Sequence, residues 1–385
     1  EVNRGRTKMI RKVTEKDFPR IYELGKLLHE NYENLYNLEE LTKKEYFKIL
    51  SPDFPEWLLD YIDAPEMQRL SGISMICGTD YSPIYNYKSF NSNLEHSIGV
   101  ALIVWNFTKD KKQTLAGLFH DIATPTFKHC IDFMNGDSKH QESTEEETEQ
   151  IIANSKHIMK LLDRDNIKIN EVSDYHIYPI ADNDTPRLSA DRFEYTFSNG
   201  LYLYDSWNLD EIAKYYNDIT ILQNEDGIEE LGFKSPQICK KYLHTILPIF
   251  ANYDDDNNRT VMQFLADIIK SMNIKGYIAI DDLYKLSEKE VIDKIRNCND
   301  NYIKESFSKF ENATSIFTSD SPINNKYCIS VKGKKRYIVP LVQSNGGKAY
   351  RITQIDETAN REVEDYLNLR RSKYTGFNFE FKPYI

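Results

Sequence analysis

Apolar residues recur at helical spacing along most of the chain. The segment 18–38 has apolar side chains three and four positions apart, which predicts an amphipathic helix. Two short helices are predicted in "PEWLLDYIDAPEMQRLSGI" (55–73), with a break at Pro65. Further helices with the same spacing are predicted at 189–199, 210–218, 236–252, 259–273, 287–298 and 301–311.

A pair of more apolar helices lies in the first third of the chain. "NLEHSIGVALIVWNF" (93–107) is apolar on nearly all sides, so we expect it to be buried. A tight turn and a second helix over 111–122 follow, which ends near Thr124-Pro125 because a residue before proline avoids the helical region. The second helix finishes with His120-Asp121. Burying either side chain without a partner costs roughly 1–3 kcal/mol, which indicates that something pairs with them.

The pattern changes toward the end of the chain. "KYCISVKGKKRYIVPLV" (326–342) and "KAYRITQI" (348–355) alternate as strands do, and "ETANREVEDYLNL" (357–369) is typical of a helix. We therefore expect a mainly α protein with a small α+β C-terminal region. Its predicted divisions are an N-terminal helical extension (1–50), a helical core (51–312) and the α+β region (313–385).

Composition and charge narrow the class of protein. The 385 residues are 40% hydrophobic and 28% charged, as in ordinary globular proteins. A net charge of -11 argues against a protein whose main role is to bind nucleic acid. Two local basic patches, "KGKKR" (332–336) and "RRSK" (370–373), are interpreted as solvated surface that can still contact anions.

No apolar run reaches 18 residues and no signal-peptide pattern is seen, so we expect a soluble cytoplasmic protein without membrane contact. The five cysteines are scattered and include no CxxC pair. This pattern fits reduced thiols better than a disulfide framework.

Histidines and aspartates on successive helices form a candidate metal site. A single histidine on an apolar helix is more often a structural residue, but His96, His120, Asp121 and Asp191 together offer two nitrogen and two carboxylate ligands. This mixture suits one divalent transition metal such as Mn, Fe, Ni, Co or Zn, and is too rich in nitrogen for Ca and usually for Mg. Four ligands leave positions open for water and a substrate oxygen, as in catalytic sites.

The order H…HD…D resembles the HD-domain superfamily of metal-dependent phosphohydrolases. Four segments resemble in order those of its deoxynucleoside triphosphate triphosphohydrolase branch, which includes bacterial dGTPases and the SAM-and-HD-domain dNTPases. These segments are "DAPEMQRLSGIS" (63–74), "NLEHSIGVA" (93–101), "LFHDIATPTFKH" (118–129) and "SADRFEYTF" (189–197). The resemblance spans about residues 55 to 365 and implies an HD-domain helical core.

The resemblance also implies roles for individual residues. His96, His120, Asp121 and Asp191 would be metal ligands, and a second Mg or Mn would accompany the substrate phosphates. His140 would protonate the leaving oxygen while Asp132 holds its tautomer, a task suited to imidazole because it titrates near neutral pH. The implied substrate-binding residues are Arg192, Tyr195, His129 and Thr124, the last of which stands where the family has a pocket histidine.

The sequence differs from the dNTPase branch at positions that contact the substrate in that branch. The positions of two phosphate-binding arginines hold Asn93 and Asn199, and the position of a glutamine that reads the sugar holds Met75. Each lost charge-assisted contact is worth roughly 1.5–3 kcal/mol. The metal site is therefore expected to be intact and the substrate site altered.

The expected function is a metal-dependent phosphohydrolase of nucleotides, in its sharpest form cleaving a dNTP to deoxynucleoside and triphosphate. The alternatives are an HD phosphohydrolase acting on another nucleotide or phosphoester, a catalytically silent nucleotide-binding sensor, and a purely structural helical protein. We expect a homo-oligomer, as in relatives of this branch, and no nucleic-acid partner.

Overall fold

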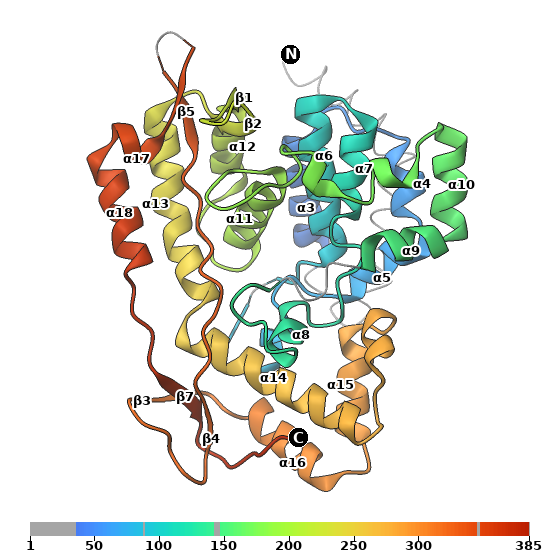
Figure 1. Cartoon of the computed structure of the whole chain (residues 1–385), viewed down its shortest axis with the longest axis vertical. Coiled ribbons are helices and arrows are strands. Elements are labelled where there is room, and N and C mark those ends of the chain that lie inside the picture. Colours follow the sequence, from blue (N-terminus) through green and yellow to red (C-terminus); the bar gives the residue numbers. More distant parts are fainter. Residues whose placement is uncertain (1–35, 88, 142–146, 345–346, 385) are drawn as a thin grey trace.

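The computed structural model describes residues 36–385 except 88, 142–146, 345–346 and 385. Helices dominate these residues, and strands are few and short (Figure 1). The predicted mainly α fold with a small β part is confirmed. The helix predicted at 18–38 lies outside the described residues except for its last three, which belong to α3 (Tyr36–Leu50).

An antiparallel helix pair forms the centre of the fold. A capping box of Ser92 and Glu95 starts α6 (Asn93–Thr108), which ends at Lys109 in the left-handed conformation. Asp110 then accepts hydrogen bonds from two backbone N–H groups and starts α7 (Lys111–Phe119). Because only two residues separate the helices, they pack side by side, and α11 (Ala190–Tyr202) packs across α6. This packing brings together three stretches that are far apart in sequence.

Short helices surround this centre. The predicted break at Pro65 is confirmed, since Pro65 is the first residue of the second short helix, where a missing N–H is tolerated. These helices are α4 (Leu58–Ile62), α5 (Pro65–Arg69), α8 (His129–Met134), α9 (Thr148–Asn154) and α10 (Lys156–Asp165). The longer ones that follow are α12 (Leu209–Asn217), α13 (Pro236–Tyr253), α14 (Asp256–Ile274), α15 (Glu288–Asn297) and α16 (Asn301–Glu311).

Two apolar clusters stabilise the described chain. The larger one surrounds α6, α7, α11 and α13. The smaller one lies in the lower part of Figure 1, where Phe264 of α14 packs against Phe310 of α16 and Phe377. No helix among the described residues is both long enough and apolar enough to cross a membrane.

A four-stranded sheet joins distant parts of the chain. Its order is β1 (Ile219–Gln223), β2 (Glu229–Phe233), β5 (Leu341–Gln343) and β6 (Ala349–Arg351). Sequence analysis missed the β1–β2 hairpin. Strand β5 pairs in parallel with β2, with Gly232 opposite Leu341. The predicted division at 312 stays a prediction, but strands from both sides of it share one sheet.

The rest of the C-terminal region forms a three-stranded antiparallel sheet and two helices. The sheet order is β3 (Phe317–Ser319), β7 (Tyr374–Phe377) and β4 (Tyr327–Ile329). The predicted helix at 357–369 is confirmed as α18 (Glu357–Leu367). The strand predicted over 348–355 is wrong in its second half, because the chain turns into the short helix α17 (Ile352–Ile355) after Arg351.

Candidate metal centre

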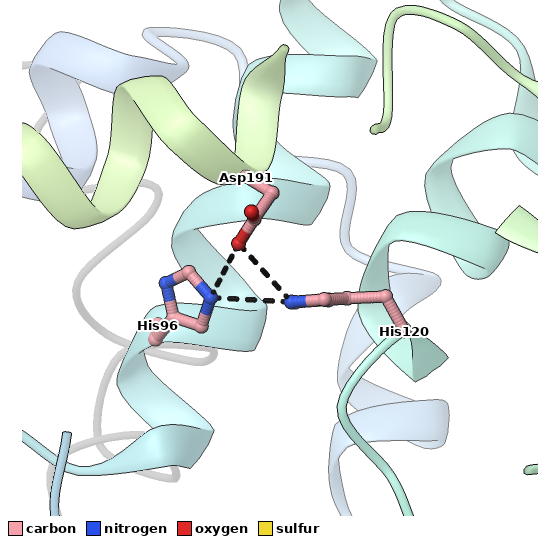
Figure 2. A group of neighbouring side chains, drawn as sticks. All are labelled: His96, His120 and Asp191. Atoms are coloured by element: carbon pink, nitrogen blue, oxygen red, sulfur yellow. Dashed lines mark hydrogen bonds and ion pairs between the residues drawn. The ribbon is translucent and has the colours of Figure 1, made fainter. Parts of the chain in front are cut away.

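Three predicted metal ligands meet where α6, α7 and α11 come together (Figure 2). The Nε2 atoms of His96 and His120 lie 3.1 Å apart, and the Oδ1 atom of Asp191 lies 3.0 Å from the first and 3.5 Å from the second. His96 lies inside α6, His120 directly follows α7, and Asp191 is in the first turn of α11. One ligand atom from each residue lies within 4.8 Å of the other two.

The other ring nitrogen of each histidine is held by an acceptor. His96 donates from Nδ1 to Oε2 of Glu194 at 2.5 Å, and His120 donates from Nδ1 to the backbone carbonyl of Gly117 at 2.8 Å. Each neutral imidazole therefore carries its proton on Nδ1 and turns the Nε2 lone pair toward its neighbour. Two lone pairs at this distance repel each other unless a cation or a proton lies between them, so the site fits a metal.

Glu194 is a functional residue that sequence analysis missed. It is buried, and its Oε1 atom also accepts a hydrogen bond from the Tyr46 hydroxyl at 3.0 Å. Gly99 allows this approach, since a Cβ atom there would lie 2.6 Å from Cγ of Glu194. A signal was present in the sequence, because residues 191 and 194 are three apart and share one helix face.

The electrostatics of the site favour bound positive charge. Burial lowers the pKa of His96, but hydrogen bonds and charge from Asp191 and Glu194 outweigh it and raise that pKa to about 9. The pKa of His120 is also raised, since the charges of Asp121 and Asp191 outweigh its burial. The two histidines hold the pKa of Asp191 well below its usual range, against the opposite effect of burial. A metal ion would satisfy the same demand for positive charge.

Asp121, the fourth predicted ligand, lies beside this group. Its Oδ2 atom is 3.9 Å from Nε2 of His96 and 3.7 Å from Nε2 of His120, and it accepts a hydrogen bond from Lys128 at 2.8 Å. Burial alone would raise the pKa of Asp121, but the charges of Lys128 and the two histidines lower it strongly. Its role as a ligand stays a prediction.

Lys128 is a second residue that sequence analysis missed. Its ammonium group is buried and also contacts the side-chain oxygen of Asn93 and, at 3.5 Å, the sulfur of Met75. Two of the departures from the dNTPase pattern, at positions 75 and 93, therefore contact one buried cation. Lys128 therefore supplies a positive charge next to residue 93, where the dNTPase pattern has an arginine.

The predicted pair of His140 and Asp132 is wrong. Asp132 accepts a hydrogen bond from Nδ1 of His129 at 2.9 Å, because α8 places these residues three positions apart on one face. His140 instead contacts Asp137 at 3.1 Å, and 69% of its side chain is exposed. Arg336, which sequence analysis interpreted as solvated surface, donates to Nε2 of His129 at 2.9 Å.

The remaining predicted substrate residues, Arg192, Tyr195 and Thr124, each contact other residues of the fold, and their role in binding substrate stays a prediction. The guanidinium of Arg192 donates to the backbone carbonyl of Arg187 at 2.8 Å, and the Tyr195 ring packs edge-on against Tyr253. Thr124 accepts a hydrogen bond through its backbone carbonyl, 2.7 Å from Arg69. Arg69 also contacts the carbonyl of residue 122, so it holds the turn after His120-Asp121 in place.

Sequence comparison finds distant relatives, while no family model matches the chain. The chain is 27% identical over 266 residues to the uncharacterized protein YdhJ of Bacillus subtilis, a match that covers 69% of this chain and 75% of YdhJ. It is 25% identical over 145 residues to the metal-dependent phosphohydrolase cns2 of Cordyceps militaris, covering 37% of this chain and 40% of cns2. It is 24% identical over 229 residues to the deoxynucleoside triphosphate triphosphohydrolase SAMHD1 homolog of Dictyostelium discoideum, covering 47% and 44%.

Solved structures share the fold. The crystal structure of the phosphohydrolase BT4208 from Bacteroides thetaiotaomicron matches with a TM-score of 0.60 at 13% identity, over 86% of this chain and 97% of that one. The chain is related to the HD-domain phosphohydrolases. In this chain, His96, His120 and Asp191 form a group of the kind that holds a divalent metal.

Proposed function

We propose that this chain is a metal-dependent phosphohydrolase that acts on a nucleotide. The observation that carries the proposal is the convergence of His96, His120 and Asp191, with both imidazoles protonated on the nitrogen that faces away from the group. The names of two relatives, a metal-dependent phosphohydrolase and a dNTP triphosphohydrolase homolog, support the same chemistry.

In the proposed mechanism, residues of the chain accept and orient the proton that moves during hydrolysis. A divalent metal, when bound, supplies Lewis-acid chemistry that lowers the pKa of a water and offsets charge on a phosphoryl group. His129 has its Nδ1 proton directed to Asp132, so its Nε2 atom can accept a proton. In the proposed step, the attacking water gives a proton to this Nε2 atom and forms the new P–O bond. The bond to the leaving group breaks, and the leaving oxygen takes that proton.

A deoxynucleoside triphosphate is the first substrate to test, with triphosphate as the product. The order of the four HD segments and the Dictyostelium relative support this choice. Asn93, Asn199 and Met75 differ from the residues that read dNTPs in the branch, so other nucleotides and simple phosphoesters belong in the same screen.

A nucleotide sensor without turnover is the second candidate. One observation favours it: Lys128 forms an ion pair with Asp121 and places a fixed positive charge beside the metal ligands. A fixed cation next to a metal site weakens metal binding by electrostatic repulsion. Turnover separates the two candidates, because a sensor would bind nucleotide without releasing product.

The first experiment combines elemental analysis with a product screen against all dNTPs, NTPs and simple phosphoesters in the presence of Mn²⁺. We expect one transition metal per chain and release of triphosphate or phosphate. His120→Ala and Asp191→Asn should each lose the metal and all turnover, since each removes one of three converging ligands. The control is His244→Ala, because this histidine is exposed on α13 and distant in sequence from every proposed ligand. Full metal content and turnover in His120→Ala or Asp191→Asn would contradict the assignment.

A further inference from the structure

An extended connector, residues 330–340 between β4 and β5, runs past α8 toward the four-stranded sheet (Figure 1). It is held along its length. The Ser138 hydroxyl donates to the carbonyl of Lys332 at 2.9 Å, the Tyr366 hydroxyl donates to the carbonyl of Arg336 at 2.7 Å, and the N–H of Val339 donates to the carbonyl of Pro186 at 2.8 Å. The backbone on both sides of residue 336 is therefore fixed against other elements.

The guanidinium of Arg336 donates to two uncharged acceptors. One is Nε2 of His129 at 2.9 Å, and the other is Oε1 of Gln141 at 2.8 Å. Since His129 directs its Nδ1 proton to Asp132, its Nε2 atom carries a lone pair and the ring is neutral. Burial and the charge of Arg336 lower the pKa of His129, against the opposite effect of Asp132.

Each of the other arginines that link the C-terminal region to the core forms an ion pair with a carboxylate, and Arg336 does not within the described part of the chain. Arg351 pairs with Glu230, Arg259 with Asp256, and Arg371 with Asp254. Among the described residues, no carboxylate lies within ion-pair distance of Arg336. An arginine held by neutral groups keeps its full charge available to an anion, and its planar group matches phosphate oxygens well.

Arg336 shares its surroundings with residues of the metal centre. Burial raises the pKa of Tyr195 to about 12, while the positive charges of Arg336 and Arg192 act on the same hydroxyl in the opposite direction. Tyr195 lies one helical turn after Asp191, so both guanidinium groups are within electrostatic reach of the same face of α11. Two buried polar atoms at positions that departed from the dNTPase pattern, Nδ2 of Asn93 and Oδ1 of Asn199, have no hydrogen-bond partner among the described residues.

We propose that Arg336 is a phosphate-binding residue of this site, which exchanges its hydrogen bonds to His129 and Gln141 for hydrogen bonds to a substrate phosphate. The inference rests on the proposed function and names a contact for the substrate phosphate. The exchange also frees Nε2 of His129 to face the reacting group, so that phosphate binding and the availability of His129 are coupled.

The test measures binding of inorganic tripolyphosphate to the full chain loaded with Mn²⁺, by isothermal titration calorimetry. Arg336→Ala should weaken binding by roughly 10- to 100-fold, the range for loss of a charge-assisted contact. Arg336→Gln should weaken it similarly, while its amide can still donate to His129 and keep the local structure. Arg361→Ala removes an exposed arginine of α18 and should change binding less than about twofold.

Metal content and thermal unfolding of each variant separate loss of binding from loss of fold. Equal binding in the parent protein, Arg336→Ala and Arg336→Gln would overturn the proposal, as would an equal loss in Arg361→Ala. So would an absence of tripolyphosphate binding in the parent protein. If the parent protein hydrolyses a nucleotide and Arg336→Gln keeps its KM, the phosphate contact fails and the proposed function stands. If no substrate turns over but Arg336→Gln loses tripolyphosphate binding, the contact stands and the proposed function fails.

Discussion

Asp132 contacts His129 and not His140, because Asp132 and His129 lie one turn apart on the same helix. Both histidines lie within eight residues of Asp132, and both have an acidic partner three residues away. Only His129 is in α8 with Asp132, while His140 is largely exposed beside Asp137. The side chain that is oriented by a buried carboxylate keeps one tautomer, which is the property that a proton-transferring group needs.

This difference gives a prediction at the residue scale. His129→Ala should lower turnover by roughly 10²–10⁴-fold, the usual range for a general acid or base, while metal content stays unchanged. His140→Ala is the matched control and should keep turnover within about threefold, since that side chain is largely exposed and contacts Asp137 rather than Asp132. A reversed order of the two variants, measured under the same Mn²⁺ concentration, would restore the original pairing of His140 with Asp132.

The convergence of His96, His120 and Asp191 could be predicted from the sequence because each lies in a helix, or directly after one, whose start is marked by a local signal. Ser92, Asp110 and Ser189 cap the three helices, and these caps fix where His96, His120 and Asp191 lie. Lys128 and Arg336 could not be placed with the same reasoning. Their roles depend on contacts with residues distant in sequence, for which a single sequence carries no signal.

At the scale of elements, α15 is attached to the centre of the fold by a buried carboxylate. Glu288, the first residue of α15, accepts a hydrogen bond from the N–H of Ser74 at 3.0 Å and is almost fully buried. Burial raises its pKa well above the usual value, an effect strengthened by the charge of Asp80 and partly offset by backbone N–H groups and Lys128. The folded protein therefore holds a proton on Glu288 more tightly than the unfolded chain does.

The sign of the resulting pH dependence follows from this shift. The contribution of Glu288 to stability is fully present below the unfolded-state pKa of about 4.3, and it is lost as the pH rises through the raised folded-state pKa. Glu288→Gln should remove this loss, so at pH 8 the variant should be more stable than the parent protein, and the two should differ less at pH 5. Urea unfolding at pH 5 and pH 8 measures the difference. Glu305→Gln, on the exposed side of α16, is the control and should follow the parent protein.

Helices with a long apolar periodicity could be predicted from the sequence, whereas short strands that depend on pairing with another strand could not. Helices α13, α14 and α16 lie close to the predicted ranges, because a helix satisfies its own hydrogen bonds. The β1–β2 hairpin was missed, since its strands are five residues each and β2 is buried along most of its length. A short buried strand has no clear alternation, and its pairing with β5 joins residues more than a hundred positions apart.

At the scale of the whole molecule, one buried ion pair joins the C-terminal region to the core. Arg351 of β6 donates to both carboxylate oxygens of Glu230 of β2, at 2.6 and 2.8 Å. Glu230 is fully buried and also accepts a hydrogen bond from the N–H of Leu188, which lies close to the start of α11. The four-stranded sheet and the segment that leads into the helix with Asp191 therefore share one carboxylate.

Breaking the ion pair between Arg351 and Glu230 should lower the free energy of unfolding of the whole protein. Arg351→Met leaves Glu230 buried without its main partner, and we expect a loss of about 3–5 kcal/mol in the free energy of unfolding. The double variant Arg351→Met/Glu230→Leu should recover much of that loss, because no unpaired charge remains. Arg361→Met, on the exposed face of α18, should have little effect. Urea unfolding measures all three, and an equal loss in single and double variants would show that packing rather than charge decides.

The connector that carries Arg336 also bears on how the protein is made. A ribosome releases the chain from its N-terminal side, so the helices with His96, His120 and Asp191 emerge long before residue 336. During that interval a nascent chain has the three residues of the candidate metal centre but lacks the guanidinium group beside His129. The proposed phosphate contact would thus be completed only when the connector has been synthesised and docked, so it would form late in folding.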